Sequence, residues 1–201
     1  MCARRLMLMF GSAIKKREPS AKRNIYKGIL GRSFAQSENL VGKNIHELPE
    51  PPEKDEQGNT LPHDHEALRT NDIVIRRISD KQISDYPNGV RRISSLAFKT
   101  YQGPCEGMSV DLERFIREAG EDPRIYVTTP KWYGSLQLSV GQIRDANLLV
   151  GYDPVPKNPY HGQIWNRDGK PTKGQQKQQE RALRRISSWF VEISGVEISE
   201  P

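Results

Sequence analysis

The sequence has few cysteines. Its 201 residues include two, Cys2 and Cys105. Two cysteines so far apart build neither a disulfide framework nor a Cys-x-x-Cys metal site. We therefore expect a protein of a reducing, cytoplasmic compartment.

Long hydrophobic runs are also lacking. No stretch approaches the roughly 20 apolar residues of a membrane span, and Leu6–Phe10 is too short for the core of a signal peptide. We expect no membrane association. With 35% hydrophobic and 28% charged residues in 201 positions, the chain has room for one domain of ordinary size and an appendage.

The charge is unevenly distributed along the chain, whose net value is +6. Residues 1–32 hold nine Lys and Arg against Glu18 alone, and another basic stretch runs from Arg167 to Arg185. Cationic side chains that meet phosphates release counterions, which favours binding to nucleic acid. The nucleic-acid-binding candidates are Arg4, Arg5, Lys15, Lys16, Arg17, Lys22, Arg23, Arg181, Arg184 and Arg185.

The basic start of the chain has three alternative interpretations. It is compatible with a solvated leader, with a start codon chosen upstream of Met7 or Met9, and with an Arg-rich organellar targeting peptide. An acidic protein is an alternative partner to nucleic acid. The sequence does not predict an oligomeric state.

Residues 33–70 have the composition of a linker. Leu48–Glu53 is rich in proline and acidic residues, which disfavours burial. Within the linker, His63-Asp64-His65-Glu66 offers two histidines at alternate positions, yet a metal site needs further ligands, and no second cluster is present. We expect no metal and no cofactor.

From residue 71 the pattern predicts an α+β domain that runs to residue 201, behind an irregular arm of residues 1–70. Its sheet is expected to be small, mixed or antiparallel, with two main helices. The predicted strands are Asp72–Ile78, Val90–Lys99, Arg124–Thr128, Leu148–Tyr152 and Tyr160–Trp165. The predicted helices are one that Ser109 caps and Gly120 ends, a short one at Val140–Ala146, and the clearest one over residues 174–193.

A histidine follows the most rigid turn of the chain. Pro154, Pro156 and Pro159 stiffen the segment before His161. In an extended strand, His161, Gln163 and Trp165 share one face. An arginine from each of two strands is expected to meet this histidine, and the catalytic candidates are His161, Arg77, Arg92 and Ser94.

The same residues have two alternative interpretations. The arginines are equally compatible with salt bridges to Asp72, Asp80 or Asp153. Cys105 would act as a nucleophile only beside a base, for which His161 is the one candidate.

The order of these elements resembles known proteins. An arginine strand, then Ser94-Ser95, then Asp-Pro and Asn-Pro-Tyr-His resembles a recurring bacterial domain over about residues 72–166. The arginine-then-serine order is also similar to ADP-ribosyltransferases, a resemblance that implies NAD held by the two strands. The chain lacks the Glu-x-Glu or Gln-x-Glu that such enzymes carry late in the sequence.

Three functional hypotheses follow. The first is a nucleic-acid-associated or accessory binding protein of a bacterial system, acting through its basic segments. The second is an enzyme on a nucleotide or another phosphate-bearing substrate. The third is a structural or interaction partner whose arm folds on binding.

Overall fold

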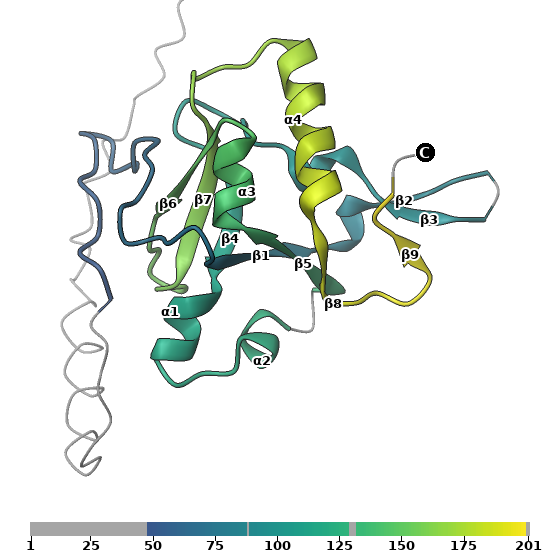
Figure 1. Ribbon diagram of the computed structural model, residues 1–201, viewed down its shortest axis with the longest axis horizontal. Coiled ribbons are helices and arrows are strands. Elements are labelled where there is room, and N and C mark those ends of the chain that lie inside the picture. The colour runs from purple at the N-terminus through teal and green to yellow at the C-terminus, as the bar shows by residue number, and fades with distance from the viewer. Residues whose placement is uncertain (1–47, 88, 129–131, 200–201) are drawn as a thin grey trace, which may run out of the picture. The chain divides into compact units, whose positions relative to one another are not determined.

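A six-stranded antiparallel sheet organises the part of the chain that the computed structural model describes, residues 48–87, 89–128 and 132–199. The strand order is β6-β7-β4-β1-β5-β8 (Figure 1). The strands are β1 (Ile73–Ile78), β4 (Met108–Leu112), β5 (Gly134–Ser139), β6 (Leu148–Tyr152), β7 (His161–Asn166) and β8 (Ser188–Val191).

A second, three-stranded sheet stands beside it in the order β2-β3-β9. Its strands are β2 (Ile83–Asp85), β3 (Arg91–Ile93) and β9 (Val196–Glu197). The helices are α1 (Glu113–Glu118), α2 (Pro123–Val127), α3 (Val140–Asp145) and α4 (Lys173–Ile186), with 3-10 turns at Asp80–Gln82 and Ser95–Phe98. The predicted α+β class is confirmed.

The core follows from the alternation of side chains along the strands. Val74 and Ile78 point from β1 into the main cluster of buried residues, where Ile143 of α3 and Leu183 of α4 join them. Figure 1 shows α3 and α4 in front of this face. Ile75 points to the opposite face and packs in a smaller cluster with α2 and β8. Each face of the sheet is therefore covered, at least in part.

Local signals predicted several elements correctly. The strands at Leu148–Tyr152 and Ile73–Ile78 and the helix that begins at Val140 form as expected, and His161 opens β7. The strand expected over Val90–Lys99 is shorter, because Ser95–Phe98 turns into a 3-10 helix.

The helix expected to begin at Ser109 is wrong in its start. Ser109 lies in β4, and the helix begins at Glu113. Met108, Val110 and Leu112 are buried on one face of that strand, so the alternation of period two outweighs the capping signal. This correction places Ser109 and Asp111 on the opposite face of β4.

Two further predictions are wrong. Arg124–Thr128 is not a strand, since Pro123–Val127 forms α2, and the Asp122 side chain caps its start by accepting from the Arg124 backbone N–H. The C-terminal helix ends at Ile186, and β8 follows. The aromatic and β-branched residues of Trp189–Val191 pair with β5 instead.

Part of the segment predicted as a linker packs on the domain. Leu68 is 3% exposed and belongs to the main core cluster. The backbone N–H of His65 donates to the carbonyl of Val150, and Arg144 of α3 forms an ion pair with Asp64. The packed chain thus extends upstream of residue 71, whereas residues 1–47 of the predicted arm lie outside the described residues.

Gly141 offers a test of this packing. A Cβ at Gly141 would meet Cγ2 of Thr70 at 2.5 Å and its carbonyl oxygen at 3.0 Å. We expect Gly141→Ala to lower the free energy of unfolding by about 1–3 kcal/mol, the usual cost of overpacking. Urea unfolding measures it.

Gly174→Ala is the matched control, because Gly174 has nothing within 4 Å of the new Cβ. Alanine there should leave stability unchanged or raise it by up to about 1 kcal/mol. Equal stability of the two variants would contradict the packing of residues 60–70.

Candidate functional site

The candidate site is a hollow of about 260 Å³ between strands β1 and β4. Within the described residues these strands form two Cα pairs, Val74 with Leu112 and Ile75 with Asp111. Beyond that point the hollow opens between them. Its lining residues are Arg76, Arg77, Ser109, Val110, Asp111, Trp132, Asn158 and His161.

Arg76 supplies a cation to this hollow. Its Nε donates to the carbonyl of Ala97 and its Nη1 to the carbonyl of Ser109, at 3.2 and 2.8 Å. Burial lowers the pKa of Arg76 to about 10, against the opposing effect of the Asp111 charge, so the side chain stays protonated at neutral pH. Within the described residues, Arg76 has no carboxylate as a hydrogen-bond partner.

Arg77 is held in place by Asp111. The guanidinium donates from Nε and Nη2 to the two carboxylate oxygens, at 2.7 and 3.0 Å. Asn158 also donates to Asp111, at 2.6 Å, and accepts from the hydroxyl of Tyr126. Asp111 is 2% exposed. This bidentate pair neutralises one arginine, and the charge of Arg76 is left in excess.

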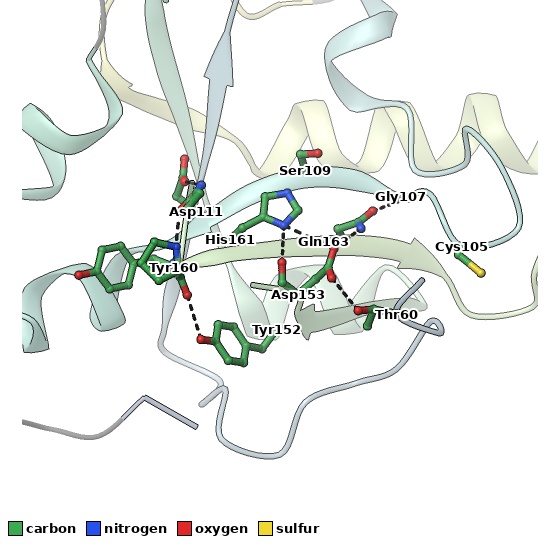
Figure 2. Close-up of polar contacts among 12 residues, drawn as sticks. Thr60, Cys105, Gly107, Ser109, Asp111, Tyr152, Asp153, Tyr160, His161 and Gln163 are labelled. Carbon is green, nitrogen blue, oxygen red and sulfur yellow. Dashed lines mark hydrogen bonds and ion pairs between the residues drawn. The ribbon is translucent and has the colours of Figure 1, made fainter. Parts of the chain in front are cut away.

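His161 meets Asp153 at the base of the β6–β7 hairpin. The backbone N–H of Asp153 donates to the carbonyl of His161 across the hairpin, and the proline-rich loop lies between them. The His161 Nδ1 is 2.7 Å from the Asp153 carbonyl oxygen and 3.5 Å from its Oδ2. Figure 2 shows this contact.

This geometry fixes the tautomer of the imidazole. A carbonyl oxygen accepts and does not donate, so Nδ1 carries the proton. In the neutral ring Nε2 is then the basic nitrogen. Within the described part of the chain Nε2 forms no hydrogen bond, and the histidine lines the hollow. The lining of one hollow thus includes a proton acceptor, His161, and a cation, Arg76.

Asp153 is the support behind this histidine. Its carboxylate accepts from the hydroxyl of Thr60 at 2.6 Å and from the amide of Gln163 at 2.5 Å. Burial opposes ionisation of the carboxyl, but the hydrogen bonds from His161, Thr60 and Gln163 outweigh it and hold the pKa of Asp153 well below its usual range. The carboxylate therefore remains charged beside Nδ1.

The four catalytic candidates divide between two places. His161 and Arg77 line the same hollow. Arg92 lies in the small sheet, where it pairs with Glu197 and stacks on Tyr86. Ser94 lies between β3 and the following 3-10 turn, and it lines another hollow beside α4. The expected constellation of four residues is thus two separate sets.

Sequence reasoning missed four residues of the site. Asp111, Asn158 and Trp132 were not singled out, and Ser109 was assigned to a helix cap. The sequence pointed to Arg76 or Arg77 without deciding between them, because the side chains of two neighbouring strand residues turn to opposite faces of the sheet. The link between Asp111 and Arg77 spans 34 positions, which no local pattern encodes.

The nucleic-acid candidates fall partly within the described residues. Arg181, Arg184 and Arg185 line a hollow of about 980 Å³ beside α4. Arg184 donates to the carbonyls of Ile93 and Ile198, which ties α4 to the small sheet. Arg4, Arg5, Lys15, Lys16, Arg17, Lys22 and Arg23 lie outside the described residues.

Three further observations concern metal ligands, membrane spans and the thiol of Cys105 among the described residues. No group of three or more His, Cys, Asp or Glu side chains there is placed to hold a metal ion. None of the helices described is both long and apolar enough to cross a membrane. Figure 2 shows the thiol of Cys105 well apart from the His161 imidazole, so His161 does not serve as its base.

The Asp153 carboxylate predicts a specific loss of stability in acid. Because its folded pKa lies below the ordinary value of 3.8, its contribution is present above pH 3.8 and is lost as the pH falls towards the folded pKa. Asp153→Asn should therefore be less stable than the wild type at pH 7. The gap should narrow below about pH 4, in urea unfolding measured at each pH. A gap that stays constant down to about pH 2 would contradict the network.

Comparison with protein-family models, with curated proteins and with solved structures finds no match to this chain. The resemblance of residues 72–166 to a bacterial domain, and of their order to ADP-ribosyltransferases, therefore stays a prediction. The functional interpretation of the site rests on its own geometry.

Proposed function

We propose that the hollow between β1 and β4 binds a phosphate-bearing ligand and that His161 acts on it as a general base. The observation that supports this most is the position of Arg76. Arg76 is one of the residues that line the hollow, and its guanidinium donates to two backbone carbonyl oxygens, whereas the neighbouring Arg77 is neutralised by Asp111. A cation without a bound carboxylate favours an anion at this place.

The chemistry of the lining favours phosphate. The guanidinium fork matches the oxygens of phosphate or carboxylate, and Asn158 and Ser109 add polar side chains to the same lining. Asp111 would repel an anion, but its two oxygens are already held by Arg77 and Asn158. The two arginines and Asp111 together leave one positive charge in excess.

His161 gives the site a catalytic group in addition to a binding one. A general base needs a free basic nitrogen within reach of the proton it removes. The Asp153 carbonyl directs the proton of the ring to Nδ1 and leaves Nε2 as the basic nitrogen. The proposed activity is transfer or hydrolysis of a phosphoryl group on a small or nucleotide-like substrate.

Arg76→Gln tests the binding step. Glutamine removes the charge and keeps hydrogen-bond capacity towards the two carbonyls. We expect the affinity for inorganic phosphate or pyrophosphate to fall about 10- to 100-fold, since a hydrogen bond to a charged group contributes about 1.5–3 kcal/mol. The affinity is measured by an NMR-monitored titration, at a temperature below the melting temperature of every variant.

The matched control is Arg92→Gln. Arg92 also belongs to a strand and loses an ion pair in this variant, but it does not line the hollow. Its affinity should equal that of the wild type. Equal losses in both variants, or phosphate binding that Arg76→Gln leaves intact, would contradict the proposal.

A second candidate function has an observation of its own. The two hollows beside α4, of about 980 and 360 Å³, share Lys177, Arg181 and Arg184 in their linings. The cations of α4 therefore border a continuous strip. We propose this strip as a contact surface for the backbone of a nucleic acid. The basic residues before position 32 would then bind the same kind of ligand.

The salt dependence of binding tests this surface. In Lys177→Gln/Arg185→Gln, the slope of log affinity for single-stranded DNA against log salt should fall by about 1.4, as two lost phosphate contacts predict. Fluorescence anisotropy measures it. Lys81→Gln/Lys157→Gln removes the same charge from other exposed positions and is the control. An unchanged slope in the α4 variant would count against the surface.

A further inference from the structure

Ser109 carries a hydroxyl at the same hollow as His161. Among the described residues that line the hollow, it is the one with a hydroxyl side chain. Ser109 is exposed, and within the described part of the chain its hydroxyl forms no hydrogen bond. The side chain therefore has no structural partner there.

The sheet places Ser109 on the same face as the His161 imidazole. In the β4–β7 ladder, Ser109 pairs with Gln163 and Asp111 pairs with His161. Residues 109 and 111 share one face of β4, as 161 and 163 do on β7, so Ser109 and His161 are diagonal neighbours on the same face. Figure 2 shows the imidazole between Asp153 on one side and Ser109 on the other, with Nδ1 turned to Asp153.

We propose that Ser109 is a nucleophile that His161 activates and Asp153 orients. This inference rests on the proposed function, because it takes the phosphate-bearing ligand of the same hollow as its substrate. In this inference the Nε2 of His161 accepts the proton of the Ser109 hydroxyl. Asp153 is a positioning residue, since it touches the imidazole and not the substrate.

The proposed reaction needs no reactant other than the substrate and water. The Ser109 Oγ attacks phosphorus, its proton passes to the His161 Nε2, and the bond from phosphorus to the leaving oxygen breaks. The imidazolium returns the proton to that oxygen, which departs as an alcohol. Water then attacks the phosphoserine and gives a proton to Nε2. Oγ departs from phosphorus and takes this proton, so that phosphate is released.

The charges of the hollow fit this sequence of steps. Negative charge on the phosphoryl oxygens builds beside Arg76, whose Nη1 already donates to the backbone carbonyl of Ser109. The guanidinium is thus held at the backbone of Ser109 before any ligand arrives, and a cation fixed in advance is what electrostatic stabilisation requires.

A fluorophosphonate probe tests the nucleophile directly. It phosphonylates an activated serine, fluoride leaves, and the proton passes to solvent through the base. We expect the full-length protein to gain one probe adduct by intact mass, located at Ser109 by peptide mapping. His161→Ala should slow labelling about 100-fold or more, the usual contribution of a general base. Asp153→Asn should slow it too, while His161→Gln should not rescue it.

The controls distinguish a failure of this inference from a failure of the proposed phosphate-binding function. Ser95→Ala changes an exposed serine beside another hollow and should label like the wild type. Excess pyrophosphate should protect Ser109. If phosphate binds the wild type and Ser109→Ala alike but no adduct forms, or if the adduct forms as fast in His161→Ala, Ser109 is not the nucleophile and the binding proposal stands. If neither phosphate nor probe binds, both fail.

Discussion

The carboxylate of Asp153 is the interaction on which the candidate site depends. It joins two parts of the chain that lie far apart in sequence: Thr60 before the first strand, and His161 and Gln163 of β7. Asp153 is 7% exposed, so its charge is tolerated only because each oxygen is held by a hydrogen bond. The backbone carbonyl of the same residue accepts from Nδ1 of His161, so the carboxylate network holds in place the residue that orients the imidazole.

A second carboxylate does the same for the arginines. Asp111 fixes Arg77 from the neighbouring strand and holds Asn158 in the loop before β7. The two carboxylates thus anchor the two ends of the same proline-rich loop. The hollow lies where β1 and β4 separate and the main-chain ladder ends, and Arg76 meets there the Ser109 carbonyl.

The sequence predicted the parts of the fold that local patterns encode. The β-branched run at Ile73–Ile78 and the apolar run at Leu148–Tyr152 form strands, as expected from their composition. It failed where two local signals compete. Ser109 before acidic residues is typical of a helix cap, yet the alternation of Met108, Val110 and Leu112 makes it a strand residue. Gly134–Ser139 mixes serine, glutamine and leucine, and only its pairing with β1 and β8 identifies it as β5.

The site was predicted in part for the same reason. Alternation placed His161 and Gln163 on one face, and both contact Asp153. The pairing of Arg77 with Asp111 depends on the register of two strands and could not be predicted from either segment alone. Arg92 was expected beside His161, but β3 belongs to the small sheet and takes it to Glu197. Contacts that depend on strand order therefore needed the structure.

The most direct test of the anion-binding hollow is the ¹⁵N NMR spectrum of the His161 ring. At a pH where the ring is neutral, we expect its proton on Nδ1 and a bare Nε2, and we expect titration with phosphate to shift the Nε2 signal first. A wild-type ring with its proton on Nε2, or an Nε2 signal that saturating phosphate leaves unmoved, would contradict the central claim that this nitrogen faces an anion-binding hollow.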